Sequence, residues 1–175
     1  MRGNPWGGDG SEAVPAIYMV CEVMSAVYHL GWILTMATDI SKRAMDKDTL
    51  IYRQGDIPSP CVFMAVSFND GDKLRLINAS NEVINAVKNI WGGNVQRESW
   101  TLLNVAWEFK LAGYPWWSSG NESVAVRVLL LNTLDILSSF GWETHTSVDI
   151  TAGPGGLGKN AGADTDCWIL RKPAN

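Results

Sequence analysis

Two aspartates, Asp39 and Asp149, have a type and spacing that could do chemistry as a pair. Each follows a predicted strand by one position and precedes an isoleucine and a hydroxyl residue. Two carboxylates that face each other could act as an acid–base pair or share a metal ion. An aspartate in this position more often has a structural role, because its carboxylate accepts hydrogen bonds from the following turn. We expect the structural role, with an aspartate-dependent hydrolase or metal-dependent enzyme as an alternative.

More acids lie close to both aspartates, at positions 46, 48, 164 and 166. Oxygen-ligand cation sites need about six or more ligands, and neither segment has the spacing of a calcium loop. The two histidines, His29 and His145, have no partner histidine at helical or strand spacing, and His145 is expected on the polar face of a strand, beside Glu143. We therefore predict no metal site, no cofactor and no catalytic residue.

A glycine-rich stretch, residues 152–163, could in principle hold an anion through its backbone N–H groups and Lys159. The lysine is followed by Asn160, whereas a phosphate-binding loop has Ser or Thr there. Predicted strands flank the stretch on both sides, so no helix N-terminus points at the anion. We predict a mobile or ligand-covering loop.

Aromatic residues are the most specific feature outside the core, because the chain has nine tryptophans in 175 residues. Trp116 and Trp117 are adjacent in a predicted loop, where both cannot easily be buried, and an exposed indole suits stacking on a ligand or partner. We predict a non-enzymatic binding module that holds a small apolar or aromatic ligand, or a partner segment, near the interface of two internal repeats. The alternative is a protein-interaction or scaffold domain that uses an exposed sheet edge and a tryptophan-rich surface. The predicted ligand-binding residues are Trp107, Tyr114, Trp116, Trp117, Trp142 and Trp168.

The elements that would position these residues form an internal repeat, because the segment 31–41 recurs without a gap at 141–151. Repeat one covers about residues 3–54 and repeat two about 104–175, with an unrepeated hairpin and helix at about 55–103. We expect one domain over residues 1–175. In each repeat a helix ends at a glycine, Gly31 or Gly141, and two strands follow.

The predicted fold class is α+β, with a mainly antiparallel sheet of about seven strands and three helices on one face. In the helix of the second repeat, the side chains expected to point inward are Val124, Val128, Leu131 and Leu134. The order strand, helix, strand, strand resembles the paired modules of GyrI-like and SOUL-type ligand-binding domains. This is a likeness of architecture, and it implies a pseudo-symmetric duplication of strand–helix–strand–strand type.

Composition limits the partners. The net charge of −4 gives no general attraction to nucleic acid, and the apolar run at 14–30 contains Glu22, which favours a buried helix over a membrane span. The three cysteines form no CxxC pair, and the first residues do not resemble a signal peptide, so we expect reduced thiols and a cytoplasmic protein.

Repeat one has almost no chain before Pro5 to supply its opening strand, so we expect an open slot beside residues 32–38 or the neighbouring strand. The unrepeated hairpin, a second copy or a partner strand could fill it. We expect the hairpin, hence a monomer, with a dimer possible.

Overall fold

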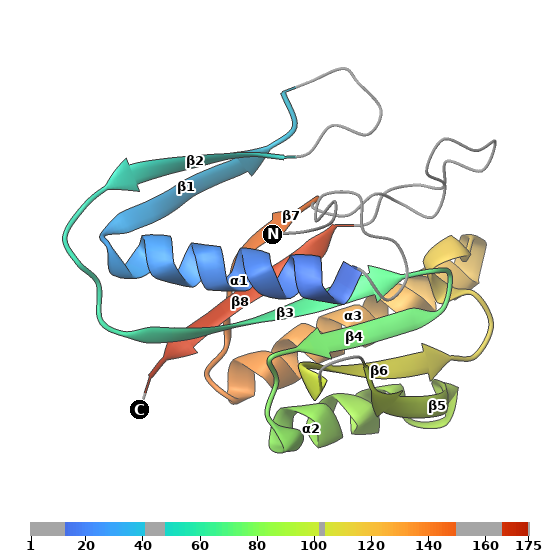
Figure 1. Cartoon of the computed structure of the whole chain (residues 1–175). Helices are drawn as coiled ribbons and strands as arrows, with labels where there is room; N and C mark the ends of the chain where they lie inside the picture. Colours follow the sequence, from blue (N-terminus) through green and yellow to red (C-terminus); the bar gives the residue numbers. More distant parts are fainter. Residues whose placement is uncertain (1–12, 41–47, 102–103, 150–165, 175) are drawn as a thin grey trace.

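The computed structural model describes residues 13–40, 48–101, 104–149 and 166–174 (Figure 1). These residues form three α-helices: α1 (Ala13–His29), α2 (Asn81–Trp91) and α3 (Gly120–Ser139). Two short 3-10 helices are η3 (Gly92–Asn94) and η5 (Pro115–Trp117). The eight strands are β1 (Trp32–Thr38), β2 (Thr49–Gln54), β3 (Cys61–Asn69), β4 (Lys73–Ile77), β5 (Val95–Trp100), β6 (Ala106–Leu111), β7 (Glu143–Val148) and β8 (Cys167–Pro173).

The main sheet has six antiparallel strands in the order β5-β6-β4-β3-β8-β7, and β1 pairs with β2 in a separate two-stranded sheet. This confirms the α+β class with a mainly antiparallel sheet and three helices. The strand that sequence reasoning left unassigned is β5, at the edge of the sheet. Its residues are mostly polar and its pairing with β6 is irregular, so it lacks the regular alternation of a half-buried strand.

The helices lie on both faces of the main sheet, so the prediction that all three cover one face is wrong. Phe63 and Ala65 of β3 belong to the core cluster that includes α1, whereas Met64 and Val66 belong to the cluster that includes α2 and α3. In Figure 1, α1 crosses in front of the sheet and α3 lies behind it. The physical reason is the central strand: six consecutive residues of β3 are buried, and a strand buried on both faces needs cover on both.

The orientation of α3 also differs from the prediction. Its fully buried side chains are Thr133 and Leu137. Val124, Val128 and Leu131, which were expected to point inward, are exposed by 59%, 50% and 57%. The apolar residues surround much of this helix, so periodicity alone could not fix which side faces the sheet.

The segments predicted as repeats share several local features. Gly31 and Gly141 follow α1 and α3 with φ of 85° and 83°. In both hairpins that follow, the first strand carries one extra residue, Thr35 in β1 and His145 in β7, and the remaining pairs have the same register. The second segment contains β6, α3, β7 and β8 in the predicted strand–helix–strand–strand order. An internal repeat predicts this correspondence.

The unrepeated hairpin, β3 and β4, does not pair with β1 or β2, so the expectation that it fills a slot beside repeat one is wrong. It lies between two strands of the second segment instead, because β3 pairs with β8 and β4 pairs with β6. The reason is that β3 is apolar on both faces, and in the centre of the main sheet residues of both faces are buried in the two core clusters.

Candidate functional site

The six predicted ligand-binding residues are not brought together in one pocket between the repeats. Trp142 is buried, and Trp107, Trp116 and Trp168 are half-buried, all as parts of the cluster under α2 and α3. Tyr114 and Trp117 are each 67% exposed. Four of the six therefore serve mainly as packing residues, and the exposed pair lies on the segment that joins β6 to α3.

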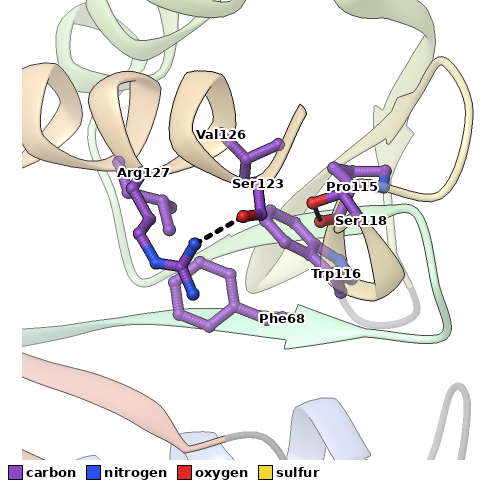
Figure 2. Close-up of a pocket in the computed structure, with 8 residues that line it drawn as sticks. Phe68, Pro115, Trp116, Ser118, Ser123, Val126 and Arg127 are labelled. Atoms are coloured by element: carbon purple, nitrogen blue, oxygen red, sulfur yellow. Dashed lines mark hydrogen bonds between the residues drawn. The ribbon is translucent and has the colours of Figure 1, made fainter. Parts of the chain in front are cut away.

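The structure places a shallow cleft of about 210 Å³ next to this segment (Figure 2). It opens between η5, the first half of α3 and the end of β3. Of the predicted residues, Trp116 lines it. The lining residues are Phe68, Pro115, Trp116, Ser118, Ser123, Val126, Arg127 and Leu130. The cleft therefore joins the second repeat to the unrepeated hairpin.

Trp116 forms a fixed wall of the cleft. Its indole Nε1 donates to the carbonyl oxygen of Lys73 at 3.0 Å, and its backbone N–H donates to the carbonyl oxygen of Gly71 at 3.3 Å. Its ring makes edge contacts with Phe68 and Trp91, with centroids 5.0 and 5.8 Å apart. Edge-to-face packing at these distances is favourable beyond the area it buries. Because the indole is held on three sides, this wall exists before any ligand binds.

The Phe68 ring forms the base of the cleft, and sequence reasoning missed it. It contacts Trp168 edge-on as well as Trp116, with centroids 4.8 Å apart for Trp168. The even-numbered residues of β3 face α3, which brings Phe68 beneath the helix. Trp168 thus supports the cleft from behind without lining it.

Arg127 places a positive charge at the rim. In Figure 2 its side chain extends from α3, and Nη1 donates to Ser123 Oγ at 2.7 Å. No carboxylate among the described residues pairs with this guanidinium. A guanidinium carries five N–H donors, so most of them are available to an acceptor on a bound molecule.

The exposed aromatics adjoin the cleft and pack on a glycine. Gly71 lies in the turn between β3 and β4, where Asp70 has a φ of 52°. A Cβ atom added at Gly71 would lie 2.8 Å from Tyr114 Cδ1 and 3.6 Å from Trp117 Nε1. The absence of a side chain at Gly71 therefore lets both rings rest on the turn while their outer faces stay exposed.

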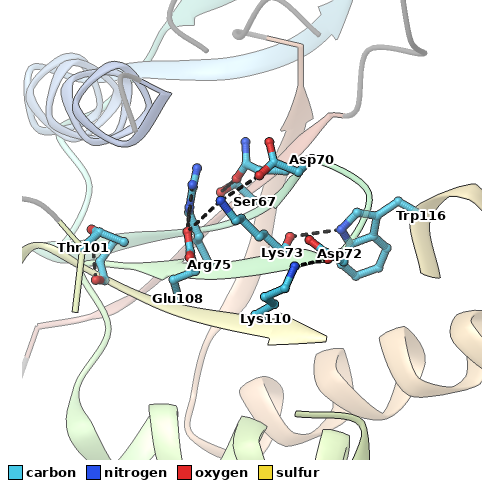
Figure 3. A network of polar contacts seen from close by, with 11 residues as sticks. Ser67, Asp70, Asp72, Lys73, Arg75, Thr101, Glu108, Lys110 and Trp116 are labelled. Carbon is cyan, nitrogen blue, oxygen red and sulfur yellow. Dashed lines mark hydrogen bonds and ion pairs between the residues drawn. The ribbon is translucent and has the colours of Figure 1, made fainter. Parts of the chain in front are cut away.

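Ion pairs on β4 and β6 hold this end of the sheet (Figure 3). The guanidinium of Arg75, a residue only 2% exposed, donates from Nε and Nη2 to Glu108 Oε2, at 2.8 Å each. Lys73 Nζ lies 2.7 Å from Asp70 Oδ2, and Lys110 pairs with Asp72. Glu108 lies in β6, Asp70 and Asp72 lie in the β3–β4 turn, and all three carboxylates are paired with cations, so their evident role is to fix this turn and the carbonyl that binds Trp116.

Asp48 and Asp149 meet at the ends of the two hairpins. The backbone N–H of Asp149 donates to Asp48 Oδ2 at 2.9 Å, and Ser147 Oγ donates to Asp166 Oδ2 at 2.9 Å. Asp48 thus caps the end of the other hairpin. Among the residues that the structure describes, no group of three or more His, Cys, Asp or Glu side chains is placed to hold a metal ion. The turn-capping role of Asp39 stays a prediction, and Asp46, Asp164 and the glycine-rich loop lie outside the described residues.

A second aromatic cluster, which sequence reasoning missed, surrounds His145 on the other side of the sheet. The imidazole contacts Phe63 and Tyr28 edge-on, with centroids 5.4 and 6.1 Å apart, and the Arg171 guanidinium lies 5.1 Å from the Tyr28 ring centroid. Burial, and then the charge of Arg171, lower the pKa of His145 to about 4. His145 is the extra residue of the β7 bulge, which turns its side chain inward from the polar face on which alternation placed it.

The cysteines Cys21 and Cys167 are buried, and Cys61 lies at the start of β3. All three are free. Burial raises the pKa of Cys21 to about 12 and that of Cys167 well above its ordinary value. Cys61 donates its backbone N–H to His29 Nε2 at 3.0 Å, so the imidazole fixes the start of β3 and does not face the thiol as a base.

The chain belongs to a domain family whose model matches residues 1–53 and 62–171, and whose description states no activity or ligand. The interruption in the match falls between the end of β2 and the start of β3. No curated protein and no solved structure matched the chain. Within the described residues, no helix combines the length and apolar character needed to cross a membrane.

Proposed function

We propose that the protein is a non-enzymatic binding module and that the cleft beside η5 holds one apolar or aromatic group. The observation that carries the proposal is the pre-formed wall of Trp116 and Phe68 next to Arg127, which forms no ion pair with a carboxylate of the described residues. Ligand pockets are mostly apolar, with a few polar groups that orient the ligand, and this lining has that composition.

The volume of the cleft limits the size of the group that it can bind. Pockets for drug-sized ligands enclose roughly 300–1,000 Å³, whereas a cavity of roughly 150 Å³ can hold benzene. A volume of about 210 Å³ therefore suits a single ring or one large side chain. The remainder of the bound molecule would lie outside, against the exposed faces of Tyr114 and Trp117.

The positive charge of Arg127 at the rim of the cleft favours a ligand that carries a hydrogen-bond acceptor. A hydrogen bond between a guanidinium and a carboxylate is stronger than one between neutral groups. We therefore assign the ligand class as a one-ring or similarly sized apolar group with a carboxylate or carbonyl near it, either on a small molecule or on a partner segment. We propose a reducing, intracellular location because all three cysteines are free, and the net charge of −4 gives no support for nucleic acid as the ligand.

Ligand-observed NMR with phenylacetate tests the proposal, with phenylacetamide as the neutral probe. Val126→Phe fills the cleft and should abolish the saturation-transfer signal of phenylacetate. Val124→Phe is the matched control, since the same change is made on the exposed side of the same helix, and it should leave the signal intact. Arg127→Gln should weaken phenylacetate at least about tenfold, because a hydrogen bond to a charged group contributes roughly 1.5–3 kcal/mol. It should weaken phenylacetamide less, because a neutral carbonyl accepts a weaker hydrogen bond than a carboxylate.

Binding that survives Val126→Phe, or that Val124→Phe removes, would place the ligand elsewhere. N-acetylphenylalanine amide distinguishes the two sources of the ligand. Tighter binding of this peptide-like probe than of phenylacetamide would favour a partner segment, because only the peptide can use the faces of Tyr114 and Trp117 outside the cleft.

A further inference from the structure

The described strands leave four sheet edges. β5 and β7 are the edges of the main sheet, and β1 and β2 are the two edges of the separate hairpin. An edge strand presents unpaired backbone N–H and C=O groups that can pair with another chain, and natural proteins blunt such edges with bulges, prolines or charges. Each of the four edges could therefore carry a bulge, a proline or a charge of this kind.

Three of the four edges carry a β-bulge. Each bulge is one extra residue in the edge strand itself, and it breaks the regular row of backbone groups. The extra residues are Thr35 in β1, Gln96 in β5 and His145 in β7. The fourth edge, β2, has no extra residue over Thr49–Gln54. It contains no proline or glycine, and its one charge is Arg53. β2 is thus the one edge among the described strands that is left regular.

The counterpart of β2 in the second segment is β8, and the same edge of β8 is occupied. Residues 168–173 of β8 pair antiparallel with β3. By the repeat correspondence these residues match 50–55, because Arg53 and Arg171 occupy the same place in their hairpins. The edge of β2 therefore has a counterpart in this fold that takes an antiparallel strand.

We propose that β2 pairs antiparallel with β2 of a second copy of this chain, about a two-fold axis at Ile51. In this register Ile51 faces its own counterpart, and Leu50 faces Tyr52 of the second copy. Ile51 is 45% exposed, and its cross-strand neighbour Met36 is 52% exposed. Pairing extends these two side chains into one apolar row across four strands.

The same register supports a second copy of this chain as the partner that pairs with the free edge of β2. Antiparallel pairing about this axis brings no like charges opposite each other, since Arg53 faces Thr49 of the other copy. A two-stranded hairpin is marginal alone, whereas three or more strands with an apolar face are stable, so the four-stranded product stabilises both hairpins. The edges that remain are the two β1 strands, and both carry the bulge. The four-stranded sheet therefore has no regular edge left for a further copy, and assembly stops at the dimer.

Sedimentation or light scattering of the full chain over a wide concentration range tests the dimer. The wild type is expected to dimerise. Ile51→Lys sets two like charges on the axis and should raise the dissociation constant at least about tenfold, or roughly 1.4 kcal/mol. Thr144→Lys is the matched control, because it adds the same charge to the bulged edge strand β7, and it should leave the dimer intact. Circular dichroism and the melting temperature of the monomer establish that each variant folds.

Cysteine cross-linking gives an independent readout that does not depend on weakening the fold. Ile51→Cys should form a covalent dimer under mild oxidation, because the two Cβ atoms face each other across the axis. Thr144→Cys and the wild type should not. A wild type that stays monomeric at the highest concentration overturns the proposal. A dimer that persists in Ile51→Lys and does not cross-link through Ile51→Cys also overturns it, and assigns the contact to another surface. Neither result bears on the cleft.

Discussion

The two glycines that end α1 and α3 offer a matched test of how the fold uses the same residue twice. Gly31 and Gly141 have nearly the same positive φ, 85° and 83°, and each donates its N–H to the carbonyl three residues earlier, at 2.9 and 2.8 Å. Their surroundings differ. A Cβ at Gly31 would lie 2.8 Å from the carbonyl oxygen of Gly55, whereas a Cβ at Gly141 would meet nothing within 4 Å. Alanine at the two positions therefore separates backbone strain from steric overlap.

The magnitudes follow from these distances. A left-handed conformation costs a non-glycine residue about 1–2 kcal/mol, and the lower entropy of the unfolded chain returns about 0.4–1 kcal/mol. Gly141→Ala should therefore lower the free energy of unfolding by about 1 kcal/mol. Gly31→Ala bears the same strain and must also displace a backbone oxygen, which adds about 1–3 kcal/mol. The displaced oxygen belongs to Gly55. The backbone N–H of Gly55 donates to the carbonyl oxygen of Gly31 at 2.8 Å, so this hydrogen bond is weakened as well.

Urea denaturation followed by circular dichroism measures both variants under the same conditions. The expected order is wild type, then Gly141→Ala, then Gly31→Ala, with the two variants separated by at least about 1 kcal/mol. Equal losses for the two variants would refute the role of the Gly55 contact. No loss in Gly141→Ala would refute the strain argument, because nothing else at that position opposes a methyl group.

Two further predictions concern buried polar groups. His145 has a folded-state pKa of about 4 against an ordinary 6.5, so its neutral form stabilises the fold above pH 6.5 and that contribution is lost as the pH falls towards 4. The full difference corresponds to roughly 3 kcal/mol, and we expect on the order of 1–2 kcal/mol because the ring is partly exposed. His145→Phe, which keeps the ring contacts, should flatten unfolding free energy against pH in this window, and an unchanged slope would assign the acid sensitivity to other groups. Thr133 Oγ1 accepts from Trp91 Nε1 at 3.1 Å in the core, so Thr133→Val should cost about 1–3 kcal/mol in a denaturation experiment by leaving the indole N–H unpaired. Thr133→Ser keeps the hydroxyl and should cost less, and equal costs for Val and Ser would argue against the hydrogen bond.

Local signals predicted the elements well. The glycines that end α1 and α3 were predicted from short-range signals, and the structure contains both. The Asn-Asp-Gly turn between β3 and β4 and the serine at the start of α2 are local features of the same kind. Ser80 Oγ accepts from the backbone N–H of Val83 at 3.5 Å, as an N-cap residue does. Element order follows from such signals because they depend on residues only a few positions apart.

The positions of the helices on the sheet depend on long-range packing, and the sequence was ambiguous about these positions. The continuous apolar run of β3 indicates burial on both faces, yet the sequence does not say which helix covers which face. In α3, Leu129, Leu130 and Leu131 are consecutive, so more than one face could be the buried one. The structure turns Leu131 outward with 57% exposure and buries Leu137.

The cleft could be predicted only in part. The adjacent indoles Trp116 and Trp117 predicted that at least one of the two would be exposed, and Trp117 is. Phe68 and Arg127 lie far from them in the sequence, and neither belongs to a motif. They line the cleft because β3 runs beneath α3, which is a consequence of tertiary packing. Likewise, the bulge at His145 overrides the alternation that placed its side chain on the polar face.

Protein-observed NMR of the wild type during titration with phenylacetate tests the proposed cleft most directly. The indole N–H of Trp116, assigned through Trp116→Phe, should shift together with the methyl groups of Val126 and Leu130. The indole N–H of Trp107, which donates to Glu98 Oε2 outside the cleft, should stay unchanged. Shifts confined to α3 positions 124, 128 and 131, or to the β1–β2 hairpin, would contradict the assignment of the cleft as the binding site.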